Sequence, residues 1–275
     1  MQERIELLAY WIRERRKMLE KRRAGMAPPW TADPILSNYR FTNVRREDDR
    51  VTIWISRHWR EPMHDHPNLT AAMVLARLVN NPNTLEVIGP PRHWNALAIS
   101  DAMKFRRAQG LKILNAAYLV TTCGVPGDKV DYIVHLASEV QRSGITPKHG
   151  ETLEEFHGAL MRFLGLGTFL AGQVVADLKN TTGNPLKTAV DWWAWAAVGP
   201  GSIKGLRAAL GQADIRERQF LPLATQLYRD VEAVYGEPLE ICMQDFQNCL
   251  CEFSKYWRAH TGTGVPKQRY DARAV

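Results

Sequence analysis

The sequence has little cysteine and no long apolar run. Its four cysteines do not form the CxxC…CxxC spacing that is typical of a structural zinc site. No segment approaches the roughly 18–20 consecutive apolar residues that a membrane-spanning helix needs. Charged residues interrupt the N-terminal segment too often for the apolar core of a signal peptide. We therefore expect a cytoplasmic protein with reduced thiols and no membrane partner.

Positive charge, by contrast, is abundant. The 275 residues include 36 Lys and Arg against 29 Asp and Glu, which gives a formal net charge of +7. Residues 1–25 hold eight basic residues against four Glu, and residues 39–60 hold six Arg against three acidic residues. Such a balance indicates a polyanionic partner, usually nucleic acid.

Helical periodicity dominates the chain. Near the N-terminus, Ile5, Leu8, Ile12 and Leu19 are spaced as on one face of a helix, and we expect this helix to pack with a solvated basic face. A weak alternation at 51–55 is the one place that favours a strand. Further helices are predicted at 69–79, 94–109, 112–119 and 129–142. The sequence predicts a mostly all-α fold in three parts: an N-terminal basic helix (1–30), a helical catalytic domain (31–258) and a basic C-terminal tail (259–275).

The most informative local pattern is a glycine-linked pair of helices over 152–178. Thr152 and the glutamate three residues later form the capping box that begins the first helix. Gly165 and Gly167 make a tight turn, and the second helix begins at Thr168. The pattern resembles a helix-hairpin-helix element, in which backbone N–H groups bind a DNA phosphate. We expect Gly165, Gly167 and Thr168 to contact DNA; the alternative is an ordinary helical hairpin.

A second glycine-rich segment follows at 199–206. Three glycines, a serine and a lysine before a predicted helix form a candidate phosphate nest. The spacing is not that of a Walker A loop, so an ATPase is not expected. The residues predicted to bind phosphate or pyrophosphate here are Gly199, Gly201, Ser202 and Lys204. A plain turn is the alternative.

For several other reactive or aromatic residues, the sequence allows both a functional role and a purely structural one. Trp192 and Trp193 have flat faces that stack on an extruded base or, more often, pack in a core. His64 and His66 flank an aspartate, but the spacing is too local to indicate a specific metal site. Cys251 is a candidate nucleophile on a pyrimidine, although helix packing is favoured because the sequence places no activating base beside it.

Several segments together resemble one family, the alpha-glutamyl/putrescinyl thymine pyrophosphorylases, also described as amino acid:DNA transferases. Asn38 to Arg50 is close to its signature RFTNVxRxxDR, and Leu164 to Leu178 resembles its hairpin GIGPFLAxQIxxDL. Asn115–Tyr118 resembles the NAY segment of the family. Asp191 together with 199–206 resembles its D…GPGxxxGL block, and 245–256 resembles its LCEFxKY ending. The family is related to the helical domain of 5-hydroxymethyluracil DNA kinases. The chain departs from the pattern in having Thr168 where proline is frequent, and Arg45 where an aromatic residue is common.

The resemblance implies phage thymine hypermodification, in the host cytoplasm. A kinase first places pyrophosphate on 5-hydroxymethyluracil in DNA, and this family is thought to displace that pyrophosphate with an amine, such as glycine, glutamate or putrescine. The implied partners are therefore modified DNA and an amino acid or polyamine. The implied architecture is that of helix-hairpin-helix DNA glycosylases, which makes base flipping an expectation. The sequence reveals no certain cofactor or metal, although Mg²⁺ on the pyrophosphate is chemically sensible.

Displacement of pyrophosphate gives the candidate residues their expected roles. Asp191 follows the hairpin as an aspartate does in those glycosylases, and it is predicted to be the general base or to stabilise positive charge on the nucleobase. Asn43 and Asp49 are expected to bond the uracil edge or to orient an arginine. Cations stabilise the leaving pyrophosphate, and the candidates are Arg40, Arg45, Arg46, Arg50 and Lys204. The resemblance adds three further candidate site residues: Tyr118, Glu252 and Lys255.

Two other functions stay open. A true DNA glycosylase would share the hairpin and the aspartate, but it has no need for the arginine-rich segment 40–50 or for the glycine-rich segment. A non-catalytic DNA-binding partner of a hydroxymethyluracil DNA kinase would bind DNA without consuming the pyrophosphate. Kinase activity is not expected because the sequence carries no P-loop domain.

Overall fold

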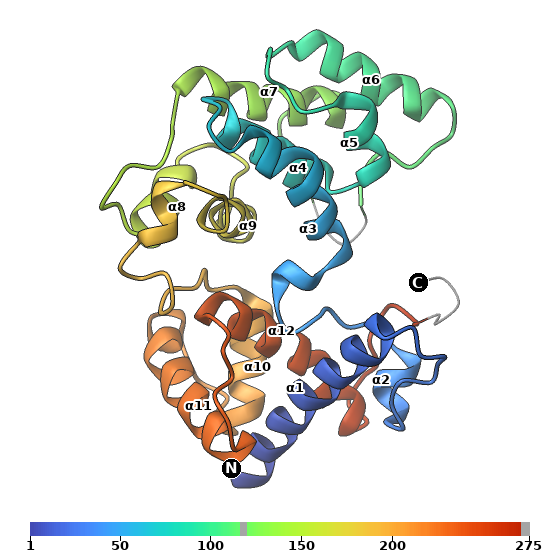
Figure 1. Ribbon diagram of the computed structural model, residues 1–275, viewed down its shortest axis with the longest axis vertical. Helices are drawn as coiled ribbons and strands as arrows, with labels where there is room; N and C mark the ends of the chain where they lie inside the picture. The colour runs from blue at the N-terminus through green and yellow to red at the C-terminus, as the bar shows by residue number, and fades with distance from the viewer. Residues whose placement is uncertain (116–119, 271–275) are drawn as a thin grey trace. The chain divides into compact units, whose positions relative to one another are not determined.

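The structure is a computed structural model that describes residues 1–115 and 120–270. These residues form helices and no strand, with one isolated antiparallel bridge between Tyr39 and Arg269, so the all-α prediction is confirmed. The chain divides into two compact units. We call Met1–Asp49 with Trp193–Val275 the terminal unit, and Arg50–Trp192 the central unit (Figure 1). None of the described helices combines the length and the apolar character needed to span a membrane.

The terminal unit joins the two ends of the chain around one apolar core. Its α-helices are α1 (Gln2–Arg23), α2 (Pro34–Asn38), α10 (Pro200–Leu210), α11 (Phe220–Tyr235) and α12 (Met243–His260), with short turns η1 (Arg46–Asp48) and η5 (Glu217–Gln219). Ile5, Leu8 and Ile12 of α1 are buried in this core, as the helical spacing predicts, and Leu19 is half-buried. α1 packs against α11, and α10 packs against α12 (Figure 1). The N-terminal helix is therefore a packing helix.

Two glycines allow α10 and α12 to cross closely. A β-carbon at Gly205 would overlap the carbonyl oxygen of Leu250, and one at Gly201 would overlap the sulfur of Cys251. Glycines four residues apart lie on the same face of a helix, so both meet α12. The segment does not precede a helix as predicted: Gly199 is the N-cap, and the helix begins at Pro200. Gly201 and Gly205 therefore have a packing role that their sequence alone does not reveal.

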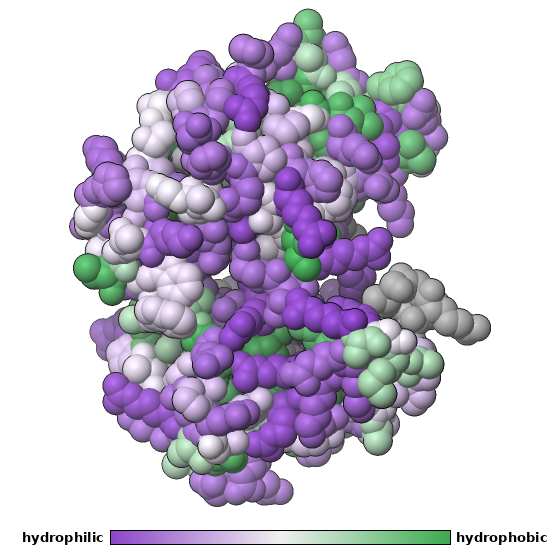
Figure 2. Space-filling model, in the orientation of Figure 1, coloured by the Kyte–Doolittle hydropathy of each residue, from purple (hydrophilic) through white to green (hydrophobic). Residues whose placement is uncertain are grey.

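The central unit contains the remaining helices. They are α3 (Arg50–Ile55), α4 (Leu69–Val79), α5 (Pro82–Ile88), α6 (Ala96–Ala108), α7 (Lys129–Ser143), α8 (Leu153–Leu160) and α9 (Thr168–Lys179), with short turns η2 (Ser56–Arg60), η3 (Glu61–Met63) and η4 (Pro185–Thr188). Every residue of α4 is buried, and α4 packs against α7 and α9. Val87, Leu97 and Phe105 of α5 and α6 are exposed, and Figure 2 shows hydrophobic side chains over this part of the unit.

Two predictions for the central unit are wrong. Residues 51–55 belong to α3 and are not a strand, because a five-residue alternation is too short to outweigh tertiary packing. Residues 112–115 are not helical, while 116–119 lie outside the described residues. The predicted helix at 69–79 is confirmed, and that at 129–142 is confirmed to within one residue.

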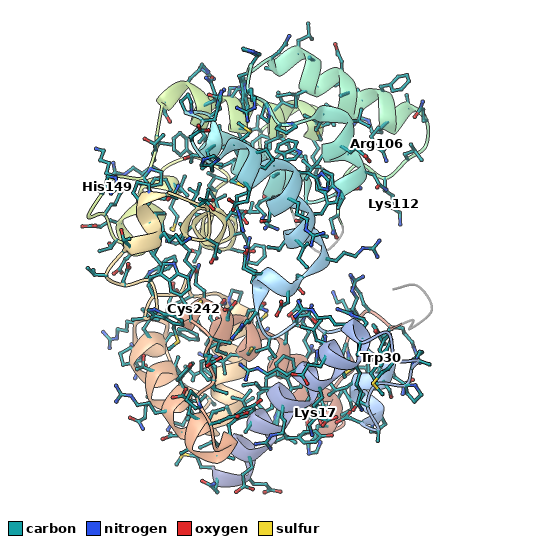
Figure 3. All side chains as sticks on the ribbon, viewed as in Figure 1. Lys17, Trp30, Arg106, Lys112, His149 and Cys242 are labelled. Carbon is teal, nitrogen blue, oxygen red and sulfur yellow. The ribbon has the colours of Figure 1, made fainter. Side chains whose placement is uncertain are left out.

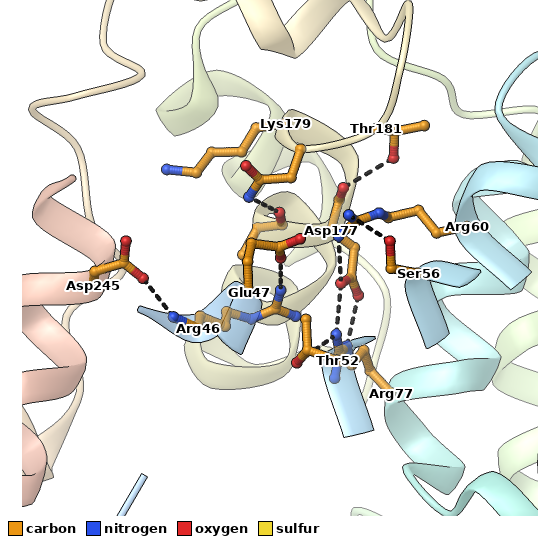
Figure 4. Close-up of polar contacts among 12 residues, drawn as sticks. Arg46, Glu47, Thr52, Ser56, Arg60, Arg77, Asp177, Lys179, Thr181 and Asp245 are labelled. Atoms are coloured by element: carbon orange, nitrogen blue, oxygen red, sulfur yellow. Dashed lines mark hydrogen bonds and ion pairs between the residues drawn. The ribbon is translucent and has the colours of Figure 1, made fainter. Parts of the chain in front are cut away.

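A buried ion pair joins α4 to α9. The guanidinium of Arg77 donates two hydrogen bonds of 2.6 Å to the two carboxylate oxygens of Asp177 (Figure 4). Arg60 lies 3.8 Å from the same carboxylate and donates to Ser56. Because removing one partner would leave the other charge buried, this pair fixes the register of the two helices.

The α10–α12 crossing predicts a sharp difference between two helical glycines. Gly205→Ala is expected to lower the free energy of unfolding by about 1–3 kcal/mol, because the added methyl group overpacks the crossing. Gly158→Ala in α8 is the matched control, since nothing lies within 4 Å of its new β-carbon. Alanine's helix propensity should there stabilise the protein by up to about 1 kcal/mol. Urea unfolding followed by circular dichroism measures both, and equal effects would contradict the close crossing.

Candidate functional site

The loop that carries the arginine-rich signature lies along one face of α12. The carboxylate of Asp245 accepts the backbone N–H of Arg46 at 2.9 Å, and that of Glu252 accepts the backbone N–H of Thr42 at 3.3 Å. Positions 245 and 252 are seven residues apart and share a helix face. Two residues between them on this face also contact the loop: Asn248 and Cys249. We call residues 41–49 the signature loop.

Arg15 of α1 braces the signature loop from the other side. Its guanidinium donates to the carbonyl oxygens of Phe41 at 3.1 Å and Thr42 at 3.2 Å, and to the side-chain oxygen of Asn43 at 3.4 Å. Arg15 is 7% exposed, whereas the side chain of Lys17, two residues on, is 52% exposed and points away from the core (Figure 3). Burial lowers the pKa of Arg15, and the carboxylates of Glu252 and Asp49 oppose that shift.

Asn43 and Asp49 are joined to each other within the signature loop. The backbone N–H of Asn43 donates to Oδ1 of Asp49 at 3.1 Å, and its side-chain amide donates to the carbonyl oxygen of Asp48 at 2.8 Å. Burial raises the pKa of Asp49 to about 6, which outweighs the opposing effect of the Asn43 N–H. The loop therefore holds a carboxyl group that titrates close to neutral pH.

Glu252 and Lys255 also belong to this cluster. Glu252 is 3% exposed, and its Oε1 lies 2.5 Å from the ammonium of Lys255 one turn along α12. Glu252 and Lys255 therefore form an ion pair on α12, as their spacing of three residues allows. Cys251, which directly precedes Glu252, packs against Gly201, and burial raises the pKa of its thiol. A thiol of this kind is a poor nucleophile, which supports the packing interpretation.

The side chains of the predicted pyrophosphate-binding cations in the terminal unit differ in how accessible they are. Arg40 and Lys204 are exposed and make no side-chain hydrogen bond or ion pair with any described residue. Arg45 donates to the carbonyl oxygen of Glu240 at 3.0 Å and stays half exposed. Arg46 is more enclosed, and it pairs with Glu47 at 3.2 Å (Figure 4). Three guanidinium or ammonium groups are thus accessible to an anion.

The start of α10 uses its serine internally. The hydroxyl of Ser202 accepts the backbone N–H of Gly199 at 3.2 Å and donates to the Gly199 carbonyl at 2.9 Å. Ser202 is fully buried, so its side chain caps the helix and does not reach the surface. Binding of phosphate at this helix start stays a prediction and depends on backbone N–H groups alone.

Asp191 lies in the central unit, where it caps helix α8. Its Oδ1 accepts the N–H of Leu153 at 2.8 Å, and its Oδ2 accepts the N–H of Glu154 at 3.1 Å. A carboxylate on the first N–H groups of a helix stabilises that helix. Asp191 therefore has a structural role that is sufficient to explain its position. Arg50, also in this unit, is exposed at the first residue of α3.

The two tryptophans differ in how accessible their rings are. In the central unit, the ammonium of Lys179 lies 4.2 Å from the ring centroid of Trp192, whose Nε1 donates to the Lys179 carbonyl at 3.3 Å. A cation therefore covers one face of that ring. Trp193, in the terminal unit, is 64% exposed. Trp193 is the better candidate of the two for stacking on a base.

The two helices of the hairpin are present, but the first ends at Leu160, before the glycines, and the two glycines have different roles. The capping box at Thr152 is present, and α9 begins at Thr168. Gly165 has a φ of +107°, and a β-carbon there would overlap the hydroxyl of Tyr132. Gly167 has an ordinary φ and open space around it. Gly165 is needed for the fold, whereas Gly167 is free to approach a ligand.

The histidines of the 62–67 loop make local contacts. Nδ1 of His66 accepts the N–H of Asn68 at 3.1 Å, and Nδ1 of His64 lies 3.0 Å from the carbonyl of Glu61. Within the described part of the chain, no three His, Cys, Asp or Glu side chains gather as metal ligands would. Tyr118, the remaining candidate, lies outside the described residues.

Arg15 is the residue of this cluster that sequence reasoning missed. It follows Ile12 by three residues and so interrupts the apolar face of α1, which is a signal that the sequence does contain. A charged residue on a buried face needs a partner, but the sequence does not say where that partner lies.

The fold and the braced loop define a helical domain with a buried polar cluster and accessible cations. Residues 2–264 match the family model described as the helical domain of 5-hmdU DNA kinase, so the chain belongs to that family. It is 26% identical to the 5-hmdU DNA kinase of Bacillus phage SP10, over 85% of this chain and 41% of the relative. The chain thus spans about two fifths of that relative's length. No solved structure matches. The predicted kinship with this helical domain is confirmed, while the transferase family stays a prediction.

The brace predicts a large stability difference between two arginines of α1. Arg15→Met is expected to lower the free energy of unfolding by about 3–5 kcal/mol, because it leaves the carbonyl oxygens of the loop without their donor and the carboxylates of Asp49 and Glu252 without the positive charge that balances them. Arg23→Met is the matched control: Arg23 contacts Asp48 of the same loop at 2.6 Å, but at the surface. Its loss should cost less than about 1 kcal/mol. Urea unfolding measures the free energy of unfolding of both variants. An equal loss in the two would contradict the role of Arg15 in holding the loop.

Proposed function

We propose that the protein acts on modified thymine in phage DNA, and that it displaces pyrophosphate from 5-pyrophosphoryloxymethyluracil with an amine. The observation that carries this proposal is the meeting of the two signature segments, 41–49 and 245–256, in one polar cluster beside accessible cations. The family of the chain and the name of its phage relative, a 5-hmdU DNA kinase, agree with a substrate of this class.

The chemistry of displacement calls for positive charge at the leaving group. As the carbon–oxygen bond on the methylene carbon breaks, negative charge gathers on the pyrophosphate. Preorganised cations stabilise that charge, and the planar guanidinium suits phosphate oxygens. The accessible cations Arg40, Arg45 and Lys204 are our candidates for this role, with the backbone start of α10 as a further anion contact.

Binding of DNA is supported by features of both units. The chain has a net charge of +7, and counterion release favours binding of such a protein to a polyanion. In the central unit, the turn at Gly167 and Thr168 offers backbone N–H groups at the start of α9. We propose that this turn contacts a DNA phosphate without reading sequence.

The direct test is mass spectrometry of the nucleosides from pyrophosphorylated hydroxymethyluracil DNA after incubation with the protein and a panel of amines. We expect an amine-substituted thymine nucleoside and released pyrophosphate. Abasic sites would indicate a glycosylase instead. Bound but unchanged DNA would indicate a non-catalytic partner of a kinase. Either result would overturn the proposal.

The same assay tests the leaving-group cations. Arg45→Ala and Lys204→Ala are each expected to slow transfer on the order of 10²-fold, because one charge that stabilises the pyrophosphate is lost. Arg218→Ala is the control, since Arg218 is exposed and has no side-chain partner among the described residues. Unchanged rates in both variants would remove these cations from the mechanism.

Binding measurements test the hairpin separately from catalysis. Gly167→Leu is expected to weaken DNA binding roughly tenfold or more, because hydrogen bonds to charged groups contribute about 1.5–3 kcal/mol. The loss should be similar for every DNA sequence. Gly158→Leu on α8 is the control, with equally open surroundings. Gly165 is unsuitable for this test because its replacement strains the turn. Equal binding by the two leucine variants would count against a phosphate contact.

A further inference from the structure

Asp49 is held differently from the other candidate carboxylates. Its Oδ1 accepts the backbone N–H of Asn43 at 3.1 Å, and its Oδ2 accepts no hydrogen bond from any described residue. Both oxygens of Asp191 accept N–H groups of α8, and both oxygens of Glu252 have a donor beside them. Among the three, Asp49 is the carboxylate with an oxygen left to accept a proton.

The charged groups around Asp49 come from three elements. Arg46 faces it from its own loop, Glu252 from α12 and Arg15 from α1. Burial is the largest influence on the carboxyl group and raises its pKa to about 6. Asn43, Arg46 and Arg15 act in the opposite direction, and Glu252 acts with burial. A carboxyl with this pKa is ionised at neutral pH and is still basic enough to take a proton.

We propose that Asp49 is the proton acceptor for the amine that displaces pyrophosphate, an assignment that rests on the proposed function. The amine nitrogen forms a bond to the methylene carbon on C5 of the uracil as the bond from that carbon to the pyrophosphate oxygen breaks. Both electrons of the broken bond leave with pyrophosphate. The nitrogen, now positively charged, gives one proton to Oδ2 of Asp49, which later passes it to water.

The position of Asp49 in the loop suits this step. The signature loop also carries Arg45, and Arg40 directly precedes it; both are among the candidates for binding the leaving group. The proton acceptor and two of the three candidate cations therefore come from one short stretch of the chain, and Arg15 and α12 hold its loop in place. Geometry of this kind keeps reacting groups together without a separate rearrangement.

The test is the pH dependence of amine transfer by the full chain on pyrophosphorylated DNA, with rates expressed against the concentration of unprotonated amine. Between about pH 5 and about pH 9, we expect the wild-type rate to fall on the acid side with a midpoint near the Asp49 pKa. Asp49→Asn is expected to slow transfer by about 10²–10⁴-fold and to abolish that acid limb. Asp48→Asn is the matched control: it changes the neighbouring carboxylate, which pairs with Arg23 at the surface, and should keep both rate and limb.

The outcomes separate this assignment from the proposed function. A wild-type protein that transfers no amine overturns both. Transfer by a folded Asp49→Asn with an unchanged acid limb overturns the assignment alone, and loss of the limb in Asp191→Asn instead would move the role to that residue. If Asp49→Asn does not fold, Asp49→Glu decides, because a carboxyl on a longer side chain should shift the midpoint and lower the rate. An unchanged midpoint and rate in Asp49→Glu overturn the assignment.

Discussion

A buried guanidinium is the constraint on which the terminal unit depends. Arg15 lies on the apolar face of α1, where a charge without partners would be strongly unfavourable. Carbonyl oxygens of the signature loop accept its N–H groups, and the carboxylates of Asp49 and Glu252 balance its charge. Satisfying this one side chain therefore fixes the loop against α1 and α12 at the same time. Segments more than 200 residues apart in the chain are brought together as a result.

The charges in and beside the signature loop lie at different depths. The carboxylate of Asp49 balances the buried guanidinium of Arg15, whereas Asp48 pairs with Arg23 at the surface and the arginines at 40 and 45 stay accessible to solvent. In the reaction that we propose, the accessible cations bind the pyrophosphate and Asp49 takes the proton. Displacement of pyrophosphate by an amine needs both, because negative charge departs with the leaving group while a proton departs from the nucleophile.

Local signals in the sequence predicted the helices well, and tertiary signals were the ones that failed. The helix at 69–79 ends where Asn80 adopts a left-handed conformation, and the capping box at Thr152 begins α8 as expected. The glycines at 201 and 205 predict a ligand loop, but they meet the sulfur of Cys251 and the backbone of Leu250 on α12, and this partner helix is not readable from their neighbours in sequence. Asn43, Asp49, Glu252 and Lys255 were all predicted as site residues, yet only the fold shows that they meet. The resemblance supplied those residues, whereas Arg15 lies before the first of the motifs that carry it.

Four carboxylates of the described residues differ in how completely their oxygens are bonded. Asp33 accepts two backbone N–H groups and two tyrosine hydroxyls, Asp177 accepts a bidentate arginine, and Asp191 caps a helix with both oxygens. Donors of this kind stabilise the ionised form and occupy the lone pairs that a proton would need. Asp49 accepts one N–H and is desolvated, so its ionised form is the less stabilised. A general base must give up little stabilisation when it takes a proton, and on that criterion Asp49 suits the role of proton acceptor that we propose better than Asp33, Asp177 or Asp191.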